Sequence, residues 1–148
     1  QAIHRHLFQD LYEWAGHVRE VELSKEGHTF QVRQYMETGM ADVHRRIVAA
    51  RYFEGLGADE FALGGSVIID DVNYIHPFRE GNGRTQLLYL KQLAERAGHR
   101  IDIMRIGREA WMEASRRAHR ADYASMGECI AAALDPVRGG VEEGDPER

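Results

Sequence analysis

Two long stretches of helical periodicity, separated by one short loop, constrain this chain more than any other feature. Residues 59–75 and 83–97 both carry apolar side chains at spacings of three and four, the pattern of an amphipathic helix. The sequence between them, His-Pro-Phe-Arg-Glu-Gly-Asn-Gly, should interrupt the helix. Proline disfavours helical geometry in the residue before it, and two glycines follow. Residues 77–83 are therefore expected to form a loop that joins two helices.

The rest of the chain also reads as mostly helical. Further helices are expected over residues 2–15, 39–54, 107–119 and 122–134. Thr38 is a candidate N-cap for the second of these. Residues 18–32 alternate loosely between apolar and polar around a Lys-Glu-Gly-His turn, which predicts a short β-hairpin. An isolated hairpin is only marginally stable, so it should rest on the helices with an exposed edge. The predicted fold class is mainly α with one small β-hairpin.

Composition excludes several classes of protein. The chain has 148 residues, of which 43% are hydrophobic and 29% are charged, as expected for one globular domain. Its formal charge of −5 argues against a nucleic-acid partner, which normally requires a basic surface. One cysteine rules out an internal disulfide framework, and no apolar run approaches a membrane span. No signal peptide is visible, and because the chain opens with Gln1 directly in a helical pattern, it is expected to be a trimmed fragment.

The inter-helix loop carries an unusual concentration of chemical groups. Its glycines can take positive φ, and the N-terminus of the following helix offers unpaired amides and partial positive charge, so together they can bind an anion. Arg84 adds a planar fork suited to phosphate oxygens. Glu80 is the one carboxylate of the loop, and Mg²⁺ bound to phosphates commonly uses one or two protein carboxylates. His76 is the group able to accept a proton near neutral pH. The loop is therefore equipped to deprotonate a hydroxyl beside a nucleotide.

The nine residues from His76 to Arg84, HPFREGNGR, match the signature HPFx(D/E)GNGRxxR of the Fic (filamentation induced by cAMP) family. The resemblance extends upstream through HRHLFQDLYEWAGHVREVELSK and downstream through AGHRIDIMRIGREAWMEASRRAHRADYASM. It covers nearly the whole chain to Leu134. It implies a Fic-type helical bundle over residues 1–134, with a hairpin flap at about 18–32 over the active site, followed by a flexible acidic tail at 135–148.

The resemblance implies a protein adenylyltransferase that uses ATP and Mg²⁺ to transfer AMP to a Tyr, Thr or Ser hydroxyl of a target protein. His76 would be the general base, Phe78 would anchor the loop, and Glu80 would hold Mg²⁺. The phosphates would be bound by the last four residues of the motif: Gly81, Asn82, Gly83 and Arg84. The target protein would dock along the flap by strand addition, which suits an exposed hairpin edge.

The chain departs from the family pattern at Leu87, where the family has a second arginine. In the family that arginine binds the γ-phosphate and pairs with the glutamate of an inhibitory helix. A charge-assisted hydrogen bond is worth about 1.5–3 kcal/mol, so its loss should weaken triphosphate binding and could relax nucleotide choice. Leu87 also continues the apolar helix face. No (S/T)xxxE(G/N) inhibitory motif occurs in the sequence. Such a helix is therefore expected in missing flanking sequence or on a separate antitoxin-like protein.

Two alternative functions stay open from the sequence. One is transfer from another nucleotide or phosphate donor on the same scaffold, and the other is a catalytically weakened module that binds a target. The cellular setting also has two readings, a toxin in the bacterial cytoplasm or an effector delivered to the host cytoplasm.

Other residues have simpler structural readings. The two histidines of His4-Arg-His6 diverge on a helix and suggest no zinc site, and Asp70 and Asp71 read as capping or surface charges. The tryptophans Trp14 and Trp111 are expected in the core, and Cys129 is expected to be a small buried side chain. Gly64 and Gly65, which each cost about 1 kcal/mol against alanine, predict a close helix contact or a kink.

Overall fold

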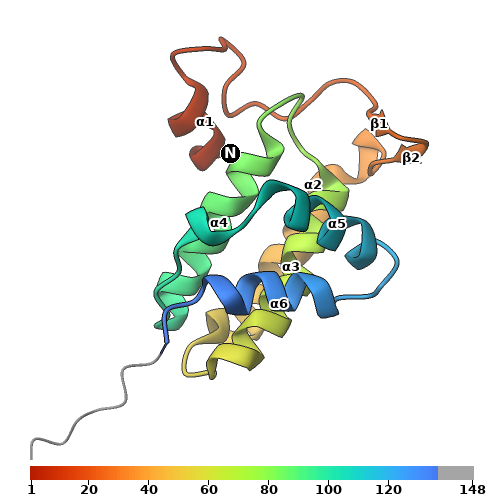
Figure 1. Cartoon of the computed structure of the whole chain (residues 1–148). Helices are drawn as coiled ribbons and strands as arrows, with labels where there is room; N and C mark the ends of the chain where they lie inside the picture. Colours follow the sequence, from red (N-terminus) through yellow and green to blue (C-terminus); the bar gives the residue numbers. More distant parts are fainter. Residues whose placement is uncertain (137–148) are drawn as a thin grey trace, which may run out of the picture.

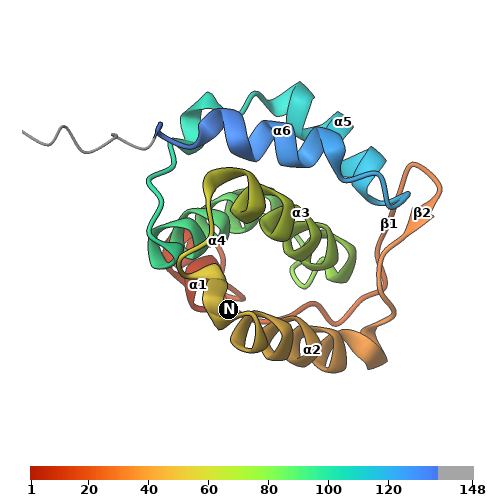
Figure 2. The ribbon, with the colours of Figure 1, turned by 90° about the horizontal axis from the view of Figure 1, so that it is seen from below.

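The computed structural model describes residues 1–136, and Figure 1 shows its arrangement. A central helix, α3 (Ala58–Ile75), packs against four others. These are α2 (Met36–Ala49), α4 (Asn82–Ala97), α5 (Arg108–Ala118) and α6 (Ala124–Ala133). Figure 2 shows α3 and α4 enclosed between α2 on one side and α5 with α6 on the other. The mainly helical fold class predicted from periodicity is confirmed.

The core lies where α3, α4 and α6 meet. Its fully buried large side chains include Phe61 and Ile69 of α3, Leu90 of α4, and Met126 and Ile130 of α6. Burying a side chain of this size is worth about 1.5–3 kcal/mol, so the core supplies much of the stability. Near the end of the described residues, Ile101 and Leu134 form an isolated antiparallel bridge. None of the helices within residues 1–136 is long and apolar enough to cross a membrane.

Of the two adjacent glycines of α3, Gly64 marks a close contact, one of the two features predicted. A Cβ on Gly64 would lie 2.8 Å from the Phe53 ring, so only glycine leaves room for that aromatic side chain. Gly65 faces Ile130 and Leu90 at ordinary contact distance. Phe53 belongs to the short 3₁₀ helix η2 (Arg51–Phe53).

Two predicted helix boundaries are wrong. The helix expected over residues 39–54 starts three residues earlier, with Tyr35 at the N-cap, so Thr38 lies inside α2 and caps nothing. It follows the 3₁₀ helix η1 (Arg33–Tyr35) and ends at Ala49. The next residues cannot extend it, because Arg51, Tyr52 and Phe53 all have positive φ, which is incompatible with a right-handed helix.

The first helix is also shorter than predicted. α1 (Ala2–Phe8) ends at Phe8, and residues 9–16 form turns instead of completing the expected helix over 2–15. The chain turns back because Gly16, at φ +82°, donates its N–H to Nδ1 of His4 at 2.9 Å. The apolar periodicity of residues 11 and 14 therefore belongs to a folded-back segment, not to a helix face.

The hairpin is present but smaller than predicted. Only β1 (Ser24–Lys25) and β2 (His28–Thr29) pair, in antiparallel register, around Glu26 and Gly27. Both turn residues have positive φ, as a tight hairpin turn requires. All four strand residues are exposed. Outside the paired residues, the N–H groups of Arg19 and Gln31 bond to Pro77 and Tyr74 at the end of α3, which limits the strand length.

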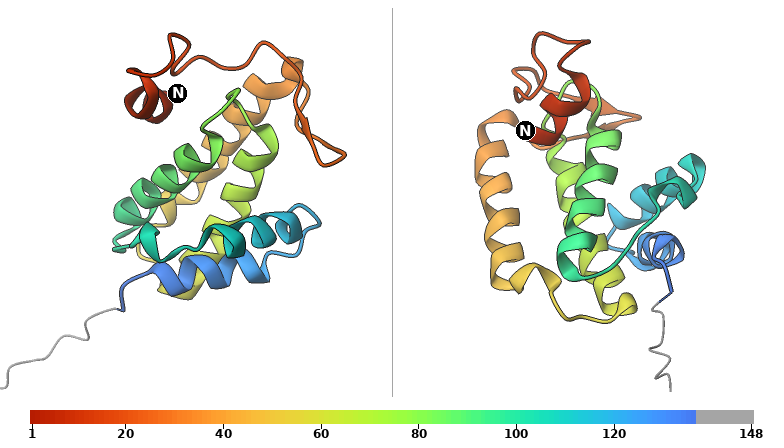
Figure 3. Two further views of the ribbon diagram at one scale, coloured as in Figure 1. Left: turned by 45° about the horizontal axis from the view of Figure 1, so that its top comes forward. Right: turned by 90° about the vertical axis from the view of Figure 1, so that its left-hand side faces the viewer.

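α1 and the hairpin lie at the same end of the molecule as the α3–α4 loop, one on each side of it (Figure 3, left). The loop is therefore flanked by two segments from the first 32 residues of the chain. The short 3₁₀ helix η3 (Ile103–Arg105) lies between α4 and α5 in the chain. The predicted domain over 1–134 stays a prediction, and most of the expected tail, residues 137–148, lies outside the described residues.

Candidate active site

The candidate site is built on the loop between α3 and α4. His76 caps the C-terminus of α3 in the left-handed conformation, at φ 47° and ψ 62°, and its N–H still bonds to Val72 at 3.0 Å. A left-handed residue at this position ends a helix, and the following Pro77 prevents its resumption. The imidazole is therefore carried at a helix end, where the sequence predicted it.

The ring of His76 is held in one tautomer and one orientation. Nδ1 lies 3.2 Å from the carbonyl oxygen of Asn73, which can only accept, so Nδ1 carries the proton and Nε2 keeps its lone pair. The ring stacks on Phe30 of the hairpin, with centroids 3.8 Å apart and planes 9° apart. Burial is the main cause that lowers the pKa of His76 to about 4, and the charges of Arg19 and Lys25 lower it further. At neutral pH the ring is therefore uncharged, and Nε2 is its proton-accepting atom.

Phe78 is buried at the start of the loop. Its side chain is 2% exposed and stacks on His4 with centroids 3.9 Å apart. Its N–H donates to Oδ1 of Asn82 at 3.0 Å, and its carbonyl accepts from Nδ2 of Asn82 at 2.6 Å. The buried Asn82 side chain therefore closes the loop on itself, and only its backbone N–H is left to face a ligand.

Only one residue of the Gly81-Asn82-Gly83 segment has positive φ. Gly81, at φ +80°, is the N-cap of α4, and a Cβ there would lie 2.3 Å from the Phe8 ring. Glycine is required at this position by both the backbone and the space. Gly83 lies in the first turn of α4 without positive φ, so its expected conformational role is wrong. Open space surrounds the place of its missing Cβ.

The N-terminus of α4 supplies amide donors. The first helical bond runs from the N–H of Thr85 to the carbonyl of Gly81 at 3.1 Å, so the N–H groups of residues 82–84 have no partner within the helix. Arg84, in the same turn, is exposed, and its guanidinium carbon lies 6.0 Å from the centroid of the Phe8 ring. Unpaired amides, helix dipole and guanidinium thus gather at one helix end.

Glu80 is exposed beside this helix end. Its Oε2 accepts a hydrogen bond from the Tyr12 hydroxyl at 3.1 Å, and that bond is the main cause that raises the pKa of Tyr12. The Tyr12 ring stacks in turn on Trp14, with centroids 4.4 Å apart. Within residues 1–136 no three His, Cys, Asp or Glu side chains gather as a metal cluster. A lone carboxylate beside a phosphate site fits Mg²⁺ that takes its other ligands from phosphate and water.

Leu87 is half-buried and packs against the core from α4. It continues the apolar face of the helix and places no charge near the phosphate-binding end. The preceding residue, Gln86, has a buried side chain that donates to Oδ1 of Asn73 at 3.2 Å. The side chain of Asn73 is thus held by Gln86, while its backbone carbonyl accepts the hydrogen bond from Nδ1 of His76.

His4 is a residue that sequence reasoning did not assign to the site. It is fully buried, and its Nε2 donates to the carbonyl of Glu80 at 2.9 Å while Nδ1 accepts from Gly16. Both ring nitrogens are used by backbone groups, so His4 has no lone pair for a metal ion. Its spacing of four from Phe8, on the buried face of α1, is the sequence signal that could have found it.

The other side chains with an expected position differ in how deeply they are buried. Trp111 is buried in the core as predicted, whereas Trp14 and Cys129 are half-buried. Asp71 pairs with Arg46 of α2, in keeping with a surface charge. Asp70 is 8% exposed, so its expected capping or surface role is wrong. It lies on the side of α3 facing Tyr123, and burial raises its pKa.

Two cavities, of about 660 and 650 Å³, lie beside α1 and behind the hairpin, and neither is lined by a residue of the loop 76–84. The candidate site, at the facing ends of α3 and α4, is thus separate from both of these cavities.

Comparison with known proteins agrees with this geometry. The model of the Fic/DOC family matches residues 1–94. "Probable protein adenylyltransferase y4lH" of Sinorhizobium fredii is 36% identical over 85% of this chain, which spans 66% of that protein. "Protein adenylyltransferase VbhT" of Bartonella schoenbuchensis is 37% identical over 76% of this chain, but the match spans only 24% of VbhT.

A solved structure has the same fold. The N-terminal Fic domain of a VirB-translocated Bep effector protein from Bartonella quintana, with bound ADP, superimposes with a TM-score of 0.82 at 27% identity. The match covers 91% of this chain and 71% of that one. The chain thus spans about two thirds or less of the curated relatives named above. From its loop signature, its fold and these similarities, this chain belongs to the Fic/DOC family.

Proposed function

We propose that this protein transfers AMP from ATP to a hydroxyl group of a target protein. The observation that carries the proposal is the fixed Nε2 lone pair of His76, beside a loop that also presents Glu80 and the N-terminus of α4. The relatives named protein adenylyltransferases, and the ADP bound to the Bartonella quintana domain, support the same activity.

In the proposed reaction Nε2 of His76 takes the proton of the target hydroxyl as its oxygen attacks the α-phosphorus of ATP. The new bond joins that oxygen to the α-phosphorus, the bond to the β-phosphate bridging oxygen breaks, and pyrophosphate leaves. A base whose pKa lies below neutral is in its accepting form throughout the physiological range, and positioned general bases contribute about 10²–10⁴-fold to rate. His76 is in this accepting form at neutral pH because burial lowers its pKa to about 4.

The phosphates would be bound by backbone more than by side chains. The free N–H groups at the start of α4 and the open space at Gly83 allow close approach of phosphate oxygens. Arg84 would add a charged fork, and Gly81 would shape the turn. Asn82 would act through its backbone, because its amide group already bonds to Phe78.

Glu80 would hold Mg²⁺. When bound, this ion neutralises charge on the phosphates. The protein contributes the position of the carboxylate: His4 holds the carbonyl of Glu80, and Tyr12 holds its carboxylate. These two contacts keep Glu80 at the rim of the phosphate site.

The target would dock along the hairpin over residues 18–32. β1 and β2 are exposed, and so are Val21 and Val32 beside them, so an extended segment can add to the hairpin edge. Phe30, stacked on His76, links that edge directly to the base. Main-chain pairing would then bring one hydroxyl to Nε2.

Leu87 supports a looser grip on the end of the triphosphate. It packs against the core where the family has an arginine, so the γ-phosphate loses a charged partner and donors other than ATP become easier to accept. Leu87→Arg should lower the KM for ATP by about tenfold, the equivalent of one charge-assisted hydrogen bond. An unchanged KM would contradict this account of the missing charge.

The proposal extends to how the activity would be inhibited and to the compartment in which it would act. With no inhibitory motif in the sequence, inhibition would come from flanking sequence or from a separate antitoxin-like protein. The activity would serve as a toxin in a bacterial cytoplasm or as an effector in a host cytoplasm. The VirB-translocated relative supports the second setting.

The test is incubation of the protein with cell lysate, Mg²⁺ and ATP labelled at either the α- or the γ-phosphate. A protein band labelled only by α-phosphate, and lost in His76→Ala, is the expected result. A band labelled by γ-phosphate would indicate phosphate transfer instead. No labelled band, with a lysate protein retained on the immobilised domain, would indicate a binding module.

A further inference from the structure

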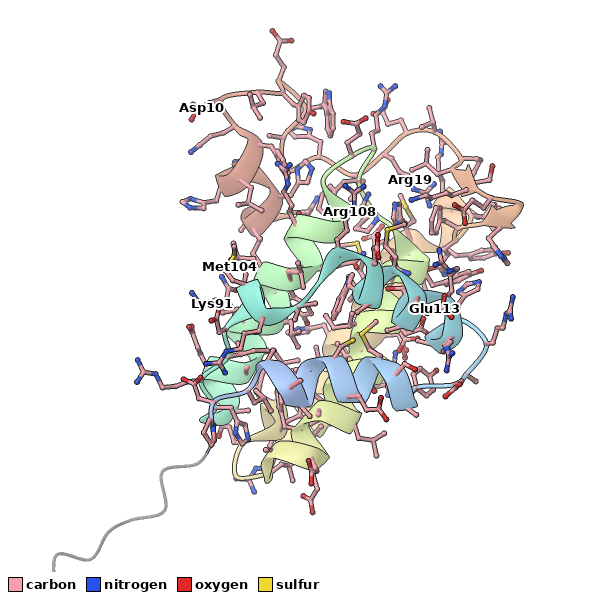
Figure 4. All side chains as sticks on the ribbon, in the orientation of Figure 1. Asp10, Arg19, Lys91, Met104, Arg108 and Glu113 are labelled. Carbon is pink, nitrogen blue, oxygen red and sulfur yellow. The ribbon has the colours of Figure 1, made fainter. Side chains whose placement is uncertain are left out.

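We infer that Arg19 is the positioning residue that joins the hairpin to the end of α3, so that target docking and the alignment of His76 depend on one side chain. The inference rests on the proposed function, because that function gives His76 and the hairpin their roles. Arg19, labelled in Figure 4, comes from the first part of the 18–32 segment.

Arg19 is buried to an extent unusual for arginine. The residue is 2% exposed and its side chain is 0% exposed, although charged side chains are almost never fully buried unless their donors are satisfied. Its nearest carboxylate, Glu22, lies 3.6 Å away and is itself half-exposed. The charge is therefore stabilised mainly by hydrogen bonds to backbone carbonyl groups.

Two of these carbonyls belong to the end of α3. Nε donates to the oxygen of His76 at 2.8 Å, and Nη2 donates to the oxygen of Ile75 at 3.2 Å. The last carbonyls of a helix have no partner within the helix, and a cation near them also complements the helix dipole. Arg19 thus caps α3 at the residue that carries the base.

The other carbonyls belong to the two arms of the hairpin. Nη1 donates to Val21 at 2.7 Å, and Nη2 also donates to Gln31. The backbone N–H of Arg19 donates to the carbonyl of Pro77 at 2.7 Å, directly after His76. One residue therefore bonds to both hairpin arms and to three successive residues at the helix end, 75–77.

The remaining contacts between hairpin and helix end are few and lie close by. Gln31 donates its N–H to the carbonyl of Tyr74 at 3.0 Å, and Phe30 stacks on the His76 ring. Both depend on the position of the second hairpin arm, which Arg19 fixes through Gln31. Arginine suits this place because it has five donors in a rigid fork, whereas lysine has three donors on one nitrogen.

The test compares Arg19→Met and Arg19→Lys with Arg33→Met as the matched control. Arg33 also donates to a hairpin carbonyl, that of Glu20, but it is exposed and none of the hydrogen bonds found for it reaches α3. Amide hydrogen exchange is followed by mass spectrometry in peptides covering 20–32 and 74–80. The kcat of AMP transfer to the labelled lysate band and the KM for ATP are measured on the same samples.

Arg19→Met is expected to lose amide protection in both peptides together. Displacement of a catalytic group by about 1 Å can cost 10²-fold, so kcat should fall by about that factor. The KM for ATP should stay within about twofold, because the phosphate site at α4 does not use Arg19. Arg19→Lys should give values between those of wild type and Arg19→Met. Arg33→Met should match wild type in amide exchange, in kcat and in the KM for ATP.

Four results would each overturn the inference. Two concern Arg19→Met itself: a kcat within about threefold of wild type, or normal amide protection of 74–80 despite a loss of activity. The others are a KM for ATP that rises as far as kcat falls, and an equal loss of kcat in Arg33→Met. If Arg19→Met does not fold, Arg19→Lys decides by the same criteria. Transfer that survives in His76→Ala would refute the proposed function instead, independently of Arg19.

Discussion

The first 35 residues and the helical bundle are held in place by different kinds of contact. The bundle core is apolar, with Phe61, Leu90 and Ile130 fully buried. The N-terminal segment buries two polar side chains, His4 and Arg19, and both bond to backbone groups of the α3–α4 loop or its flanks. The comparison indicates that the bundle determines the fold, whereas the N-terminal segment determines the geometry of the site loop.

The largest effect on stability is expected in the bundle. Phe61→Ala removes a fully buried aromatic ring where α3 meets its neighbours and should lower the free energy of unfolding by about 3–5 kcal/mol. Leu63→Ala, on the same helix but 60% exposed, should change it by about 0.5 kcal/mol or less. Urea unfolding followed by circular dichroism measures both, and equal losses would show that the core is placed wrongly.

Acid is expected to act next most strongly, through His76. Its folded pKa is about 4 against 6.5 unfolded, so the unfolded chain binds more protons between these values. Stability is therefore complete above pH 6.5 and is lost as pH falls toward 4, by up to about 3 kcal/mol. The difference in unfolding free energy between wild type and His76→Gln, measured from pH 8 to pH 4, isolates this contribution from the carboxylates. A constant difference would contradict the burial of the ring.

His4→Phe is expected to have a smaller and local effect. The ring can still stack on Phe78, but the N–H of Gly16 and the carbonyl of Glu80 lose their partner, at a cost of about 1–3 kcal/mol. Hydrogen exchange should rise in residues 12–16 and 78–82 while the bundle stays protected. His6→Phe, the exposed neighbour, is the control. Exchange that rises evenly over the whole chain would remove the distinction between the two regions.

Tyr12→Phe is expected to have the smallest effect. Its hydrogen bond to Glu80 is exposed, so the unfolding curve should superimpose on that of wild type. The bond should instead be visible in a spectroscopic pH titration, since Tyr12 is one of three tyrosines with a raised pKa, with Tyr89 and Tyr123, and its pKa alone should return toward the ordinary value in Glu80→Gln. A wild-type titration that Glu80→Gln leaves unchanged would show that the contact is absent in solution.

The same division explains what the sequence could predict. Helix periodicity is local, so α3 and α4 begin within one residue of their predicted starts and both end at the predicted residue. The turn at Glu26 and Gly27 was also predictable from composition. Arg19 was not, because its partners at positions 75 and 76 lie more than fifty residues away and are backbone atoms. Asp70 was misplaced for a related reason: its burial depends on the α5–α6 connection, which periodicity in α3 does not reveal.

For the α3–α4 loop, the sequence shows which residue types come together more completely than how they are arranged. The motif places His76, Glu80 and Arg84 near one helix end, as the loop between two helices requires. That Asn82 would turn inward to Phe78, and that Gly83 would be helical, depends on how Phe78 is anchored by His4. The stacking of Phe78 on His4 joins segments more than seventy residues apart, and no local pattern contains it.

The most direct test of the account is the state of the His76 ring in solution. In protein labelled with ¹⁵N-histidine, the account predicts that His76 has a protonated Nδ1 and an unprotonated Nε2 at pH 7, with a midpoint of titration near pH 4. A proton on Nε2 at neutral pH, or a midpoint near the ordinary value of 6.5, would contradict it, because the ring would then lack the fixed and buried base on which the proposed transfer depends.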